Sequence, residues 1–195
     1  MLLAILSGIF ALAFYYDVFT DALKGKIKPN PSSWFIWSLN DSLILVASWS
    51  AGAYNTLVVP FVYAIFGWAI LAVTIKNNPS KLSLIEIVCL TGSTVSWVLY
   101  FLIPNPLYSL IIAVIVNAIG CLPTMAGLWR DPKRESFRSW SLLLVASILS
   151  ITSLEHYKFA LLLFPISSLI LIVVINLLIL RKSPASLDIT VFTVL

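Results

Sequence analysis

The residue with the clearest chemical potential in this sequence is Asp41, a carboxylate inside the apolar segment 33–53. It belongs to the run Trp37-Ser-Leu-Asn-Asp-Ser42. An ionisable side chain at such depth is costly to bury and indicates a functional site by default. We therefore predict that Asp41 binds a cationic or hydroxylated solute, or carries a coupling proton. The alternative is a carboxylate that packs helices together, with hydrogen bonds from Asn40, Ser42 or basic loop residues.

Amides and indoles within apolar segments complete the candidate binding set: Asn40, Asn117, Asn176, Trp37 and Trp97. An amide offers both donors and acceptors to a polar solute, and an indole offers a stacking wall to a ring-shaped one. The alternative for each asparagine is an interhelical hydrogen bond, which is the preferred interpretation for Asn176. The alternative for each tryptophan is a ring that faces the lipid.

Three prolines are candidate hinges: Pro60, Pro123 and Pro165. A proline inside a helix lacks an N–H and frees a backbone carbonyl. Pro60 and Pro165 each lie sixteen residues before a basic residue, Lys76 or Arg181, which indicates equivalent positions. The alternative is a kink without motion.

Two further carboxylates, Asp17 and Asp21, are four residues apart and share a helix face. We expect them to pair with Lys24 and Lys28 and to form a structural gate or anchor rather than a binding site.

The elements that position these residues are predicted to be membrane helices. Hydrophobic residues make up 61% of the 195-residue chain and charged residues 10%, and the mean hydropathy is +1.03. Soluble domains carry about 25% charged residues. Crossing the hydrocarbon takes about 20 helical residues, and the apolar runs lack the alternation of barrel strands. We predict an all-α membrane protein with seven spans: 2–23, 33–53, 57–75, 83–103, 107–128, 139–154 and 159–180.

The distribution of basic residues predicts the orientation of these spans. Eleven of the 12 Lys and Arg residues lie after the first, third and fifth spans or in the carboxyl-terminal tail. Because basic loops stay in the cytoplasm, the amino terminus is expected outside and the carboxyl terminus inside. The expected location is the cell (inner) membrane. Topology also explains the net charge of +4, so no nucleic-acid partner is expected.

An internal repeat is indicated when Ser33-Trp34 is aligned with Ser139-Trp140. The alignment places Lys24 on Arg130 and Lys28 on Arg134. One transmembrane domain, 1–195, would then hold two parallel three-helix repeats joined by a linker helix. The expected ranges are about 1–80 for repeat one, 83–103 for the linker, 107–182 for repeat two and 183–195 for a tail without an assigned role.

This arrangement of three, one and three helices resembles the SWEET and PQ-loop transporter superfamily. Leu122-Pro123-Thr124, with Leu128-Trp129-Arg130 and Ser136 after it, looks like a degenerate PQ motif in which Thr124 replaces glutamine. Tyr16-Asp17-Val18 occupies the corresponding place in the first repeat. The resemblance covers about residues 1–182. It implies a solute path between two three-helix bundles, opened alternately to each side, and a solute-binding role for Asn176.

No P-loop, HExxH, GxSxG or GxGxxG motif is present, and the single histidine supports neither a catalytic triad nor a metal site. We therefore expect no enzyme and no cofactor. The expected function is a transporter or facilitator for a small polar solute, such as a sugar or amino acid. The alternative is a seven-helix receptor or sorting protein that binds a ligand without moving it, and a third hypothesis is a structural subunit of a larger complex. The expected partners are the solute and the lipid bilayer, with homo-oligomerisation left open.

Overall fold

The computed structural model describes residues 2–50, 58–77, 82–103, 106–154 and 159–181. This part of the chain is all helical. It contains α1 (Leu2–Leu23), α2 (Pro31–Ser50), α3 (Val58–Asn77), α4 (Leu84–Leu102), α5 (Pro106–Arg130), the 3-10 turn η2 (Pro132–Arg134), α6 (Phe137–Thr152) and α7 (Phe159–Leu180). The predicted tail, 183–195, lies outside the described residues.

Each predicted span coincides with one helix, and the ends agree within three residues. Three described segments are long and apolar enough to cross a membrane: Leu2–Leu23, Ile111–Arg130 and Leu162–Leu180. Shorter apolar segments occur in α3, α4 and α6. The sixth helix is the shortest of the seven, with 16 residues, as its brief apolar run predicts.

Polar residues fix where several helices begin. Asn30 accepts hydrogen bonds at its Oδ1 from the backbone N–H groups of Ser32 (2.9 Å) and Ser33 (3.1 Å), and Pro31 opens α2. These contacts satisfy N–H groups that a helix start leaves without partners. Ser136 caps α6 by accepting from the N–H of Ser139 at 3.3 Å.

A capping box begins α4. The Ser83 hydroxyl accepts from the N–H of Glu86, and the Glu86 carboxylate accepts from the N–H of Ser83 at 2.7 Å. The same carboxylate also accepts from Asn30 at 2.8 Å. Glu86 therefore caps its own helix and ties α4 to the start of α2.

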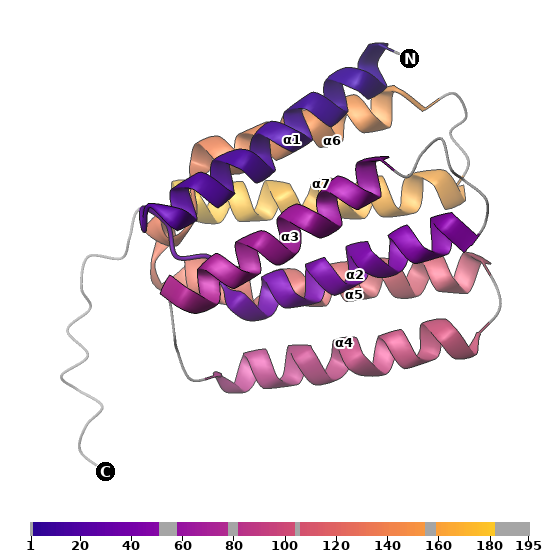
Figure 1. Cartoon of the computed structure of the whole chain (residues 1–195), viewed down its shortest axis with the longest axis horizontal. Helices are drawn as coiled ribbons and strands as arrows, with labels where there is room; N and C mark the ends of the chain where they lie inside the picture. The colour runs from indigo at the N-terminus through magenta and orange to yellow at the C-terminus, as the bar shows by residue number, and fades with distance from the viewer. Residues whose placement is uncertain (1, 51–57, 78–81, 104–105, 155–158, 182–195) are drawn as a thin grey trace.

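Six helices form a closed ring in the order α1, α3, α2, α5, α7, α6, in which each packs on the next and α6 packs back on α1. α4 lies outside the ring, against α5 and, to a smaller extent, α2. Successive helices run in opposite directions (Figure 1). The carboxyl ends of α1, α3, α5 and α7 therefore share one end of the molecule (Figure 1). We call it the basic end, because the described Lys and Arg residues lie at these helix ends or in the loops and the first turn of α6 that follow them. We call the opposite end the open end.

The outward faces of the helices are apolar. Large exposed side chains occur along α1, α4 and α7, including Ile9 (55% exposed), Val88 (61%) and Leu177 (63%). Soluble monomers seldom expose contiguous apolar patches of more than a few hundred Å². The inner faces instead build two buried clusters, one inside the ring and one between α4 and the ring. Both cysteines, Cys89 and Cys121, are free and buried.

Candidate functional site

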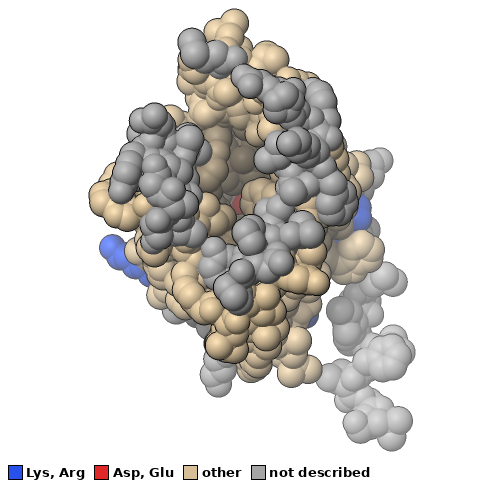
Figure 2. Space-filling model, turned by 90° about the vertical axis from the view of Figure 1, so that its right-hand side faces the viewer, with Lys and Arg blue, Asp and Glu red and all other residues tan. Residues whose placement is uncertain are grey.

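A cavity of about 330 Å³ lies inside the ring. All six ring helices line it, and the described residues of α4 contribute nothing to the lining. Figure 2 views the open end and shows the molecule hollowed there, with acidic atoms visible deep inside. The volume falls within the range of small-molecule sites.

Asp41, the first of the predicted binding residues, lies in the wall of this cavity. Among the described lining residues it alone carries a formal charge. The Tyr15 hydroxyl interacts with the carboxylate as a hydrogen-bond donor, and Tyr63 lies within electrostatic range of it. Three helices, α1, α2 and α3, thus converge on the carboxylate.

Aromatic rings close the cavity toward the basic end. Phe14 lies 6.4 Å from Trp34 and 5.3 Å from Trp140, measured between ring centroids. Trp37 lies 5.4 Å from Trp34 and 6.2 Å from Trp140. Phe14, Trp34 and Trp140 are at most 3% exposed. We call Phe14, Trp34, Trp37 and Trp140 the aromatic floor. Their edge-to-face and offset contacts pack these four rings together inside the helix ring, on the side of the cavity nearer the basic end.

Two other predicted residues, Trp37 and Asn117, also line the cavity. The Trp37 indole N–H donates to the backbone carbonyl of Asn117 at 3.4 Å, and the Asn117 amide donates to the Ser168 hydroxyl at 3.2 Å. These bonds join α2, α5 and α7. The Trp37 ring fits here because Gly120 has no side chain: a Cβ at that position would lie 2.6 Å from the indole nitrogen.

The remaining predicted binding residues do not line the cavity. Asn40 is buried in α2, at 5% exposed. Asn176 is buried in α7 and donates to the backbone carbonyls of Trp140 (3.3 Å) and Ile172 (3.0 Å). These bonds are interhelical and intrahelical, as the preferred interpretation of Asn176 anticipates. Trp97 lies on α4, outside the ring, where it packs near Ile36 and Cys89.

The three candidate hinge prolines have different positions. Pro165 lies inside α7 and lines the cavity, and Pro123 is fully buried inside α5. Pro60 lies in the first turn of α3 as described, and its side chain is outside the described residues.

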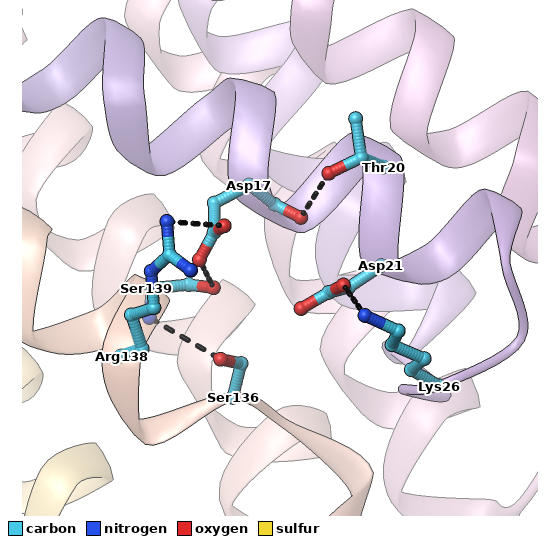
Figure 3. A network of polar contacts seen from close by, with 7 residues as sticks. All are labelled: Asp17, Thr20, Asp21, Lys26, Ser136, Arg138 and Ser139. Atoms are coloured by element: carbon cyan, nitrogen blue, oxygen red, sulfur yellow. Dashed lines mark hydrogen bonds and ion pairs between the residues drawn. The ribbon is translucent and has the colours of Figure 1, made fainter.

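Beneath the aromatic floor, polar contacts join α1 to the start of α6 (Figure 3). Asp17 accepts a hydrogen bond from the Ser139 hydroxyl at 2.7 Å and lies 3.5 Å from the guanidinium of Arg138. Asp21 instead pairs with Lys26 at 3.2 Å. The prediction of Lys24 and Lys28 as partners was wrong. Asp17 contacts residues of α6, which are distant in sequence, because α6 packs directly on α1.

A matching set of contacts joins α2 to α5 and the two loops to each other. The Ser33 hydroxyl accepts from the N–H of Thr124 at 3.1 Å. The N–H of Lys28 donates to the carbonyl of Arg134 at 2.8 Å, and the Arg134 side chain donates to the carbonyl of Lys28 at 3.2 Å. Together with the Asp17 contacts, these form what we call the polar layer. Two sets of contacts therefore lie between the cavity and the basic end: the aromatic floor and then the polar layer.

Glu135 lies beside the polar layer, outside the helices. It is buried and accepts a hydrogen bond from the Trp140 indole at 3.1 Å. Burial raises the pKa of Glu135 to about 7, although the bond from Trp140 and the charge of Arg134 oppose the shift. The loop thus carries a carboxyl group that titrates near neutral pH and touches the aromatic floor.

Sequence reasoning missed Tyr15, Tyr63, Trp34 and Trp140 as cavity residues. One signal was available, because Trp34 and Trp140 are equivalent in the repeat alignment. The two tyrosines carry no such signal, since only the packing of α1 and α3 against α2 brings them to Asp41.

In the described part of the chain, no group of three or more His, Cys, Asp or Glu side chains is arranged to hold a metal ion. Comparison of the chain with protein-family models, curated proteins and solved structures found no match.

Proposed function

We propose that this protein is a membrane transporter or facilitator that moves a small polar solute by alternating access between two three-helix bundles. The observation that carries the proposal is the cavity. It lies at the centre of a six-helix ring, its described lining contains one carboxylate, it opens at one end, and two layers of contacts lie between it and the other end. A static binding protein needs the cavity but has no need of a second, separable closure.

The membrane assignment rests on the outer surface and the charges. Exposed apolar side chains cover the outside of the bundle, and a bilayer is the solvent in which such a surface is stable. The basic end would face the cytoplasm. The cavity would then open to the outside, and the polar layer would be a cytoplasmic gate.

The proposed repeat is supported by contacts that recur at one sequence offset. Lys28 and Arg134 are 106 residues apart and bond each other, as expected for equivalent residues beside a two-fold axis. The same offset relates Ser33 to Ser139, whose hydroxyls make the two cross-bundle bonds of the polar layer. It also relates Asn30 to Ser136, the caps of α2 and α6.

Parallel repeats of this kind are related by an axis along the membrane normal. Rocking of one bundle against the other would break the contacts of α1 with α6 and of α2 with α5, while the contacts within each bundle persist. We also propose that the protein is related to the SWEET and PQ-loop superfamily, because that resemblance implies the same two bundles and the same solute path between them.

Tracer uptake into proteoliposomes tests the function. A panel of sugars, amino acids, amines and nucleosides would be offered to wild type and to Asp41→Asn. Uptake of one class that the variant loses supports transport through this cavity. Uptake that survives in the variant keeps transport and removes Asp41 from the path. Binding of a solute without uptake, by protein that elutes as a single folded species, favours the receptor or sorting alternative.

A further inference from the structure

The chemistry of the cavity wall narrows the class of solute. A sugar needs several hydrogen-bonding groups that are free to receive it. The Ser7 hydroxyl is engaged with the carbonyl of Ala146 at 2.8 Å, and the Asn117 amide with Ser168. Ser147 and Ser150 add two hydroxyls to the wall, and most of the other lining side chains are aliphatic or aromatic. The wall is therefore poor in groups for a polyhydroxylated solute.

The same wall is rich in groups that bind a cation. Asp41 supplies a negative charge, and among the described lining residues no Lys, Arg or His opposes it. A carboxylate that faces an apolar cavity without a counter-charge attracts a mobile cation, because the apolar walls screen the charge less than water does.

Aromatic rings surround this carboxylate. Tyr15 and Tyr63 both face Asp41, and their ring centroids are 5.0 Å apart. Tyr15 continues to Trp34 at 6.2 Å and Trp34 to Trp37 at 5.4 Å, so the rings form one connected wall. Trp37 lies one helical turn before Asp41 on α2. Aromatic faces attract cations within about 6 Å of the ring centre, and cages of such rings recognise alkylated ammonium groups.

We propose that the solute is a small organic cation, with an ammonium group held between Asp41 and the rings of Tyr15, Tyr63 and Trp37. That the bound cation is also transported rests on the proposed function. Its binding in the cavity does not depend on transport. The apolar remainder of the cavity, lined by residues such as Leu143 and Leu171, would receive the carbon body of the molecule.

Binding is tested with two probes of the same shape. Choline carries a quaternary ammonium, and 3,3-dimethyl-1-butanol replaces its nitrogen with carbon. Tryptophan fluorescence and calorimetry on protein in lipid nanodiscs would measure both, with tetramethylammonium and glucose alongside. We expect an ammonium probe to bind at least about tenfold more tightly than the neutral isostere.

Variants locate the site. Asp41→Asn should weaken the ammonium probe at least about tenfold, Asp41→Glu should weaken it less, and Trp37→Leu should weaken it while leaving the neutral isostere almost unaffected. Asp21→Asn is the matched control, because it removes a carboxylate at the basic end, outside the cavity. Equal binding of the two probes, no ammonium binding at all, or undiminished binding by folded Asp41→Asn would each overturn the inference.

Uptake measured on the same protein separates the two proposals. Ammonium binding without uptake leaves the cation site standing and refutes transport. Uptake of a neutral solute, without ammonium binding, leaves transport standing and refutes the cation site.

Discussion

The polar layer makes a prediction in which a neutral hydroxyl matters more than an ion pair. Ser139 donates a 2.7 Å hydrogen bond to Asp17, and Ser139 is fully buried. A hydrogen bond to a charged group contributes about 1.5–3 kcal/mol. The Arg138 side chain is 80% exposed and its nitrogen is 3.5 Å from the carboxylate, so solvent screening reduces this pair to about 1 kcal/mol or less.

If the contact of α1 with α6 exists only while the basic end is closed, then Ser139→Ala destabilises the closed state by the energy of the lost hydrogen bond. The open-to-closed ratio rises accordingly. A loss of 1.5–3 kcal/mol corresponds to roughly a ten- to hundredfold change. Arg138→Gln should change it less than about fivefold. Thr20→Ala is the matched control, because the Thr20 hydroxyl donates to the Asp17 backbone carbonyl within α1, so that the variant removes a hydrogen bond that does not cross between the bundles.

The assay is reaction of a cavity thiol from the basic side. Ser147 lines the cavity, so Ser147→Cys would be introduced after Cys89→Ser and Cys121→Ala. A membrane-impermeant maleimide added to inside-out vesicles then reports the open population. Labelling should rank Ser139→Ala far above Arg138→Gln and Thr20→Ala. Equal labelling of Ser139→Ala and Thr20→Ala would refute the role of the polar layer as a gate.

Two further predictions concern stability. A Cβ on Gly67 would lie 2.7 Å from the Ser38 hydroxyl and 3.3 Å from its Cα, so Gly67→Ala should separate α2 from α3 and cost about 1–3 kcal/mol. A Cβ on Gly8 meets nothing within 4 Å, so Gly8→Ala should leave the stability unchanged. Denaturation of both variants in detergent measures the difference, and equal stability of the two would contradict the close packing of α2 on α3. The pKa of Glu135 rises from 4.5 to about 7 on folding, because the buried carboxyl group favours its neutral form. The contribution of this group to folding stability is therefore fully present below pH 4.5 and is lost as the pH rises through 7. Wild-type stability should fall by about 3 kcal/mol from this group between pH 5 and 8; Glu135→Gln should remove that fall, and an unchanged pH profile contradicts the assignment.

Much of the fold could be predicted because helix length and apolar composition are local properties. The boundaries of α1 and α7 follow from runs bounded by polar residues, and Pro31 and Pro106 mark where α2 and α5 begin. The ring order could not be predicted, since short loops make successive helices antiparallel but do not choose their lateral neighbours. In the structure α1 packs on α3 and α6, and α2 has no comparable packing on α1.

The candidate site divides in the same way. Asp41 stands out in the sequence because a carboxylate inside an apolar run is rare. Asn40 beside it points elsewhere, since neighbouring residues on a helix differ by about 100°, and Trp97 lies on the helix that the ring excludes. The partners of Asp17 could not be predicted, because sequence proximity favours the nearby lysines. Ser139 reaches Asp17 only through the packing of α6 on α1.

Counterflow tests the central claim most directly. Proteoliposomes would be loaded with an excess of the unlabelled solute that the uptake panel identifies, and the same solute, labelled, would be added outside. A cavity that opens to one side at a time predicts a transient accumulation of label above its equilibrium level, lost in Asp41→Asn. A simple rise to equilibrium, or no entry of label from protein that binds the solute, would contradict alternating access.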